Sequence, residues 1–288
     1  TATVRRGADR DDVAYREPYA KEKARLLARI NEERRQAGIG PVAYDLLAAK
    51  VGDEFCADQA ATRATGHWDT AGRPPHLRWA LAGGVDYEAE NFASRSRYGY
   101  PLKEEIGALI LGAHESFMNE RPPANGHKET ILDPLFTHVG IGAARIGGEF
   151  RMTEEFVRRV ADWIELPAGP LPAGSRARVA MKLRAPFRAG VVEIAWEAPP
   201  RPMTRGEIAR RASYSYPPAT HTLRPLLGGG MTWEGGGRGD FATTPDGRIE
   251  LSVPLDHGPG VYYVIAYVGQ SVTQRRLSPA TGVPVVAE

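Results

Sequence analysis

The 288-residue sequence has only one cysteine, Cys56, so it cannot form an internal disulfide. It has no apolar run near the roughly eighteen residues that a membrane-spanning helix needs. Its 37 Lys and Arg residues almost cancel its 35 Asp and Glu residues, and the net charge of +2 gives no reason to expect a nucleic-acid partner. Because Cys56 lies in a helical run, we expect a buried thiol that packs as a small apolar side chain.

Motifs of the common hydrolases are also missing. The chain has no His-Glu-x-x-His zinc motif and no Gly-x-Ser-x-Gly nucleophile elbow. Ser94, Ser96 and Ser116 lie near other polar residues in the sequence, but no motif selects one of them as a nucleophile. The sequence therefore favours a protein that binds over one that catalyses.

Helical periodicity marks the first part of the chain. Residues 1–17 are a charged extension with few apolar residues. Leu26, Leu27 and Ile30 then recur at helical spacing, which predicts an amphipathic helix over residues 17–36. Composition and spacing predict three further helices, over residues 45–63, 76–82 and 102–119.

The period then changes from that of a helix to that of a strand. Apolar residues alternate within residues 138–146, and Gly147-Gly148 suits a hairpin turn into a second strand over residues 149–157. Helices beside a small antiparallel sheet predict an α-β-α sandwich for residues 18–160.

A Pro- and Gly-rich segment divides the chain. Residues 161–175 are predicted to be a linker, because prolines and glycines at this density cannot continue a helix or a central strand. Residues 176–288 contain short apolar or alternating runs separated by turn sequences, which predict an all-β, sandwich-like domain. The predicted strands cover residues 178–183, 191–196, 248–253 and 261–268. The fold class of the whole chain is therefore α+β.

Four polar residues of the N-terminal half are candidates for one site: His67, Glu90, Glu120 and His127. His67 lies in a polar loop, whereas Glu90 is flanked by apolar residues, as a partly buried carboxylate in need of a partner would be. Residues 126–134 are predicted to form a loop that re-enters the core. Because Glu120 precedes His127 by seven residues, the end of the long helix and this loop can bring both side chains to one wall.

Two imidazoles and two carboxylates can hold a divalent metal such as zinc, with water at the open positions. The same groups can act as general acid and base in hydrolysis. Glu115 competes with Glu120 for the second acidic position, but the two are five residues apart and cannot share one helix face well. We choose Glu120.

The ordered motifs resemble the CAP superfamily, the SCP/PR-1-like fold of cysteine-rich secretory proteins, antigen 5 and pathogenesis-related 1 proteins. The matching segments are residues 26–34, residues 41–48, His67, Ala89-Glu90-Asn91, Phe117-Met118-Asn119, Gly126-His127, residues 136–142 and residues 150–156. The resemblance covers residues 18–160 and implies an α-β-α sandwich with a cleft that contains His67, Glu90, Glu120 and His127. The cysteine hinge and the sterol-associated loop of the family are not found, so lipid binding is not implied.

Three functions are compatible with these features. The favoured hypothesis is a secreted or cell-envelope protein of bacterial type that binds a divalent metal and a small or extended ligand in the cleft without catalysis. The alternatives are a metal-assisted, peptidase-like hydrolase with the same residues and a structural envelope protein with a vestigial cleft. Because the chain begins at Thr1 rather than Met, we expect a signal peptide to have been removed.

The C-terminal half is expected to attach the protein to a cell-wall, carbohydrate or protein partner. Its aromatic residues either line a sugar-binding face or, as is more common, fill the core of the sandwich. These residues are Trp196, Tyr214, Tyr216, Trp233, Tyr262, Tyr263 and Tyr267. The isolated histidines are interpreted as structural or surface residues: His76, His114, His138, His221 and His257.

Overall fold

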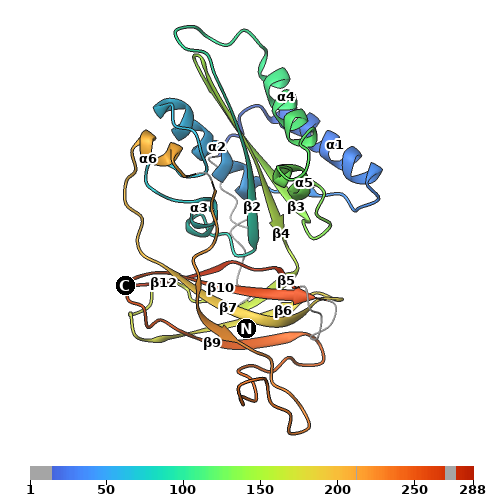
Figure 1. The fold of residues 1–288 in the computed structure, drawn as a ribbon, viewed down its shortest axis with the longest axis vertical. Helices are drawn as coiled ribbons and strands as arrows, with labels where there is room; N and C mark the ends of the chain where they lie inside the picture. Colours follow the sequence, from blue (N-terminus) through green and yellow to red (C-terminus); the bar gives the residue numbers. More distant parts are fainter. Residues whose placement is uncertain (1–14, 212, 270–276) are drawn as a thin grey trace.

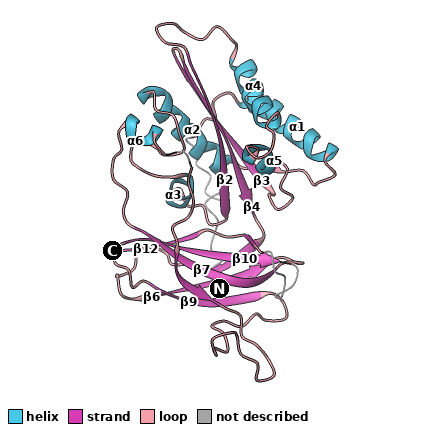
Figure 2. Cartoon of the chain, viewed as in Figure 1, coloured by secondary structure: helices cyan, strands magenta, loops and turns pink. Residues whose placement is uncertain are grey.

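The computed structural model describes residues 15–211, 213–269 and 277–288. In the N-terminal half a four-stranded sheet has helices on both faces (Figure 1). The C-terminal half consists mainly of strands, which form two further sheets (Figure 2). The predicted α+β class is therefore confirmed.

Most of the predicted N-terminal extension lies outside the described residues. In the part of the chain that is described, no helix is both long and apolar enough to cross a membrane.

The four helices predicted from periodicity are present. They are α1 (Ala20–Gln36), α2 (Leu46–Thr62), α3 (Pro75–Leu81) and α4 (Ile106–Met118). Leu26 and Ile30 of α1 are fully buried, as their spacing predicted. Asp45 begins α2, because its carboxylate accepts a hydrogen bond from the backbone nitrogen of Ala48. Cys56 of α2 is buried, as expected.

The N-terminal sheet has the strand order β1-β3-β4-β2. Its strands are β1 (Ala43–Tyr44), β3 (His138–Ile146), β4 (Glu149–Arg158) and β2 (Tyr87–Ser96). The hairpin between β3 and β4 turns at Gly147-Gly148, as predicted. Strand β2 was not predicted, although it pairs with β4 over its whole length and carries Glu90 opposite Glu155.

One prediction in this half is wrong for an important residue. Residues 126–134 were expected to form a loop, but they begin with the short helix α5 (Gly126–Ile131). Helix α5 places His127 in its first turn and buries Ile131 completely. The core contact of Ile131 therefore fixes the orientation of the helix that carries His127.

Helix α2 lies against β3 at unusually short range. A Cβ atom added to Gly142 of β3 would lie 2.2 Å from the backbone carbon of Gly52 in α2. A Cβ atom added to Gly52 would in turn lie 2.5 Å from Oγ1 of Thr153 on β4. Only glycine at both positions allows this approach, and it brings the helix directly onto the sheet that carries the acidic residues of the site.

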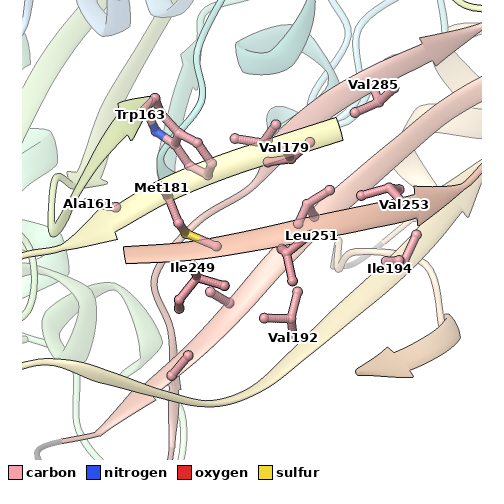
Figure 3. Packing of buried hydrophobic residues seen from close by; sticks show 14 of the residues in the cluster. Ala161, Trp163, Val179, Met181, Val192, Ile194, Ile249, Leu251, Val253 and Val285 are labelled. Atoms are coloured by element: carbon pink, nitrogen blue, oxygen red, sulfur yellow. The ribbon is translucent and has the colours of Figure 1, made fainter. Parts of the chain in front are cut away.

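The C-terminal half has two sheets around one core. The first contains β5 (Ala161–Glu165), β6 (Arg176–Leu183) and β9 (Arg248–Pro254). The second contains β7 (Arg188–Glu197), β8 (Ala219–Leu223), β10 (Gly260–Gly269), β11 (Ser278–Pro279) and β12 (Val283–Ala287). Figure 3 shows side chains from both sheets in this core, among them Val179, Leu251 and Ile194. The predicted linker over residues 161–175 is corrected at its start, because residues 161–165 form β5 and pair with β6.

A long connection joins β7 to β8 and is the part of the C-terminal half nearest the site. We define the β7–β8 connection as residues 198–218; it contains the short helix α6 (Arg205–Ala209). In Figure 1, α6 lies beside the N-terminal half rather than beside the strands that flank it in sequence. The two halves also share a buried cluster in which Leu77 of α3 packs with Tyr263 and Ile265 of β10.

Candidate functional site

One cavity of about 770 Å³ is lined by all four candidate residues, His67, Glu90, Glu120 and His127. The N-terminal sheet supplies Glu90 from β2, and the segments that flank the sheet supply the other three. Glu115 is exposed on α4 and does not line this cavity, in agreement with the choice of Glu120. Ser94, Ser96 and Ser116 do not line it either.

The first pair of the site is His67 with Glu90. Nδ1 of His67 lies 2.7 Å from Oε1 of Glu90, whose side chain is buried. Arg78 of α3 donates to the second oxygen, Oε2, and also to the backbone oxygen of His67 at 2.8 Å. Arg78 therefore holds both members of the pair, a role that the sequence analysis did not assign to it.

Burial determines the protonation of this pair. Burial, together with the positive charge of Arg78, lowers the pKa of His67 to about 4, so its imidazole is neutral near pH 7. Burial raises the pKa of Glu90 to about 8, although Arg78 acts in the opposite direction. When Glu90 is ionised, a neutral His67 donates from Nδ1 to Glu90 and keeps the lone pair of Nε2 for a ligand.

The second pair is His127 with Glu120. Oε1 of Glu120 lies 2.5 Å from Nδ1 of His127, and Oε2 accepts hydrogen bonds from the backbone nitrogens of His127 at 3.1 Å and Lys128 at 3.4 Å. The ring of His127 packs against Phe117, with centroids 4.5 Å apart. Asn91 donates to the backbone oxygen of His127 at 3.1 Å, which ties α5 to β2.

Two further carboxyl groups lie behind the first pair. Glu88 and Glu155 are 2% exposed, and their carboxyl groups face each other. Burial raises the pKa of Glu88 and of Glu155 well above the ordinary value, and the negative charges of Glu155 on Glu88 and of Glu90 on Glu155 raise it further. A neutral carboxylic acid is therefore expected here near pH 7. Glu88 also lines the cavity.

The C-terminal half contributes a wall that the sequence analysis missed. The hydroxyl oxygen of Tyr214 accepts a hydrogen bond of 2.5 Å from the backbone nitrogen of Glu90, and its ring lies 4.8 Å from that of His67. Tyr216 and Tyr267 line the same cavity, whereas Tyr262 and Tyr263 belong to buried clusters. The alternation in Ser213-Tyr214-Ser215-Tyr216 indicates an extended segment with both tyrosines on one side, but nothing in the sequence identifies the surface that they contact.

The arrangement limits how a metal could bind. Within the described residues, no group of three or more His, Cys, Asp and Glu side chains is close enough to hold a metal ion. The carboxylates of Glu90 and Glu120 already accept hydrogen bonds at both oxygens. Among the described residues, the Nε2 atoms of His67 and His127 are the ring nitrogens of the two pairs that do not face a carboxylate.

Comparisons with known proteins were made at the level of sequence and of structure. No family model matches the sequence, and a search of curated proteins gives no match. Among solved structures, an extracellular protein with an SCP domain from Bacillus anthracis is 20% identical, with a TM-score of 0.37 over 48% of this chain and 41% of that protein. An outer surface protein of Borrelia burgdorferi is 17% identical, with a TM-score of 0.40 over 49% of this chain and 96% of that one.

A cysteine-rich secretory protein from Staphylococcus aureus is 15% identical, with a TM-score of 0.34 over 50% of this chain and 42% of that protein. This chain thus spans less than half of the Bacillus and Staphylococcus proteins.

Proposed function

We propose that residues 18–160 form the CAP domain of a secreted or cell-envelope protein, and that the cleft of this domain binds a divalent cation together with a second ligand. The observation that carries the proposal is the pair of His–Glu hydrogen bonds on one cavity. In each pair Nδ1 of the histidine faces a carboxylate, so Nε2 is the nitrogen left for a ligand.

The chemistry of such pairs supports metal binding. A histidine that ligates a metal commonly donates its other ring N–H to a carboxylate, which fixes the tautomer and raises the basicity of the ligating nitrogen. His67 meets this condition near pH 7, because its lowered pKa keeps the ring neutral. Two imidazoles leave open coordination positions for water or for an atom of a ligand, as a binding site requires.

We favour binding without catalysis, because among the described residues no Ser, Thr or Cys side chain hydrogen bonds to the imidazole of His67 or His127. The serines of the cavity, Ser213 and Ser215, lie on the exposed side of the β7–β8 connection, and no hydrogen bond between them and an imidazole is found among the described residues. A metal-assisted hydrolase remains the alternative, since a metal-bound water needs no protein nucleophile.

Calorimetric titration of the metal-free full chain with zinc at neutral pH tests the proposal. We expect saturable binding at one site in the wild type and its loss in the His67→Ala/His127→Ala double variant. The matched control is His221→Ala/His257→Ala, a surface pair with ring centroids 5.9 Å apart. Loss of binding in the control instead, or no binding in the wild type, would reject a metal site in the cleft.

The same samples distinguish the alternative functions. Zinc-dependent cleavage of an unstructured protein such as casein, absent in the His67→Ala/His127→Ala variant, would identify a hydrolase. Binding without cleavage is the outcome expected here. A chain that binds no zinc and cleaves nothing would correspond to a structural envelope protein with a vestigial cleft.

A further inference from the structure

The β7–β8 connection leaves its own sheet and runs along the loop that carries His67. The backbone nitrogen of Met203 donates to the backbone oxygen of Thr70 at 2.9 Å. Ile208 is fully buried against Gly66, where an added Cβ atom would lie 3.2 Å from its Cγ2 atom. Contacts at both ends of this stretch fix the connection on the N-terminal half.

The last residues of the connection form one wall of the cavity. Along residues 213–216 the serines are exposed and the tyrosines are partly buried, as in an extended segment with two different faces. Tyr214 contacts the backbone of Glu90 and the ring of His67, and Tyr216 stacks on His76 with centroids 4.5 Å apart. The wall is therefore anchored on the loop and on α3, and the cavity belongs to both halves of the chain.

The chemistry of the lining is one-sided. Among the described residues the cavity has no lysine and no arginine in its wall. Its side chains include four glutamates and four tyrosines: Glu88, Glu90, Glu120, Glu193, Tyr87, Tyr214, Tyr216 and Tyr267. Carboxylates attract cations, and tyrosine rings bind cations through their π faces. An anionic ligand would find no described lysine or arginine on these walls.

One glutamate points to a cationic ligand in particular. Glu193 of β7 forms no ion pair with a described lysine or arginine, and its carboxylate accepts a hydrogen bond from Tyr267 across the same wall. A cationic group that enters between the halves would therefore meet the carboxylate of Glu193, which no described lysine or arginine pairs with.

We propose that the cleft is a two-domain site that binds a ligand bearing an ammonium or guanidinium group, such as a basic peptide segment, between the CAP domain and residues 213–218. Glu193 and the tyrosine rings of the C-terminal half select this ligand. The inference rests on the proposed function of the cleft as a binding site, and it names the chemical class of the second ligand. It also assigns the C-terminal half a role in the site itself.

The test is a calorimetric titration of the full chain at low ionic strength with acetyl-Lys-Lys-Lys-amide, and separately with acetyl-Glu-Glu-Glu-amide. We expect the lysine peptide to bind and the glutamate peptide not to bind. Glu193→Gln should weaken lysine-peptide binding about fivefold, the loss expected for one partly screened charge. Glu250→Gln, the same change at an exposed position of strand β9 outside the cavity, should leave the affinity unchanged.

Three results would overturn the inference. They are equal binding of the two peptides, an equal effect of Glu193→Gln and Glu250→Gln, and binding of the neutral sugar triacetylchitotriose in place of the lysine peptide. The zinc titration separates this failure from that of the metal site. Zinc binding without lysine-peptide binding would reject the inference alone, and lysine-peptide binding without zinc binding would reject the metal site alone. Binding of neither would reject both.

Discussion

His114 shows how a single buried residue makes stability depend on pH. Its Nδ1 atom lies 2.6 Å from Oε1 of Glu154, its Nε2 atom lies 2.7 Å from Oε2 of Glu33, and its side chain is 2% exposed. Burial lowers the pKa of this imidazole, but the two carboxylates raise it more, so the net pKa lies above the ordinary value. The folded state therefore holds the proton more tightly than the unfolded state does.

The sign of the effect follows from this shift. The stabilisation by His114 is complete below the unfolded pKa of about 6.5 and is lost as the pH rises through the raised folded-state pKa. We expect His114→Gln to lower the free energy of unfolding by about 3 kcal/mol at pH 6, because it leaves two buried carboxylates without their cation. Urea denaturation from pH 6 to pH 9 should show a smaller pH dependence in the variant.

His257→Gln is the control for this experiment, because the imidazole of His257 is exposed and among the described residues hydrogen bonds only to Asp256. Glu90, whose pKa burial raises to about 8, adds a pH dependence of the same sign to both variants. The difference between the two variants therefore isolates His114. Equal pH dependence in both would contradict the raised pKa.

Arg78 is the residue on which the first His–Glu pair depends. Replacing it by methionine would leave Glu90 buried without its cation and the loop of His67 without a donor to its backbone. We expect Arg78→Met to cost about 3–5 kcal/mol of stability in urea denaturation. The double variant Arg78→Met/Glu90→Gln should recover part of that loss, since it removes the unpaired carboxylate. A double variant that is as unstable as the sum of the single variants would refute this coupling.

The sequence predicts which residues form the site better than it predicts how their side chains pair. His67, Glu90, Glu120 and His127 could be chosen from the ordered motifs, and they do line one cavity. The sequence placed Glu120 and His127 on one wall, but the pairing of His67 with Glu90 could not be predicted, because Arg78, which binds both, lies eleven residues beyond His67 and belongs to no motif.

At the scale of elements, the contact of α2 with β3 gives the clearest test. Gly142→Ala would place a Cβ atom 2.2 Å from backbone in α2, so helix and sheet would have to separate. We expect a loss of about 1–3 kcal/mol in urea denaturation. Gly112→Ala is the matched control, because Gly112 lies on the exposed face of α4 and an added Cβ atom would meet nothing within 4 Å. This control should be stabilised by about 0.4–1 kcal/mol.

The elements that could be predicted are those in which apolar residues recur at the spacing of a helix or of a strand. Helices α1 and α2 and the β3–β4 hairpin have this property. Strand β2 was missed because its buried positions include Glu88, Glu90 and Asn91, so its alternation is not one of apolar with polar residues. Helix α5 was missed because only six residues form it and glycine opens it, a composition typical of a loop.

At the scale of the whole molecule, the composition of the sequence changes between the two predicted halves, but residues of the two halves pack against each other. Tyr87 of β2 donates from its backbone nitrogen to the backbone oxygen of Ala280 at 3.3 Å, and His76 lies 3.2 Å from Glu197. These contacts join residues more than a hundred positions apart, and no local pattern encodes such pairs. The C-terminal half was expected to serve an outside partner, but one of its faces contacts the N-terminal half.

The shared cluster predicts that the two halves unfold together. Leu77 of α3 is 1% exposed and packs with Tyr263 and Ile265 of the C-terminal half, so Leu77→Ala should cost about 2–5 kcal/mol. Leu81→Ala on the same helix is the control, because Leu81 is 51% exposed and its loss should cost little. Differential scanning calorimetry should show one transition, and Leu77→Ala should lower its midpoint as a whole. Two transitions, only one of which moves in Leu77→Ala, would mean that the halves are independent and that the cluster does not couple them.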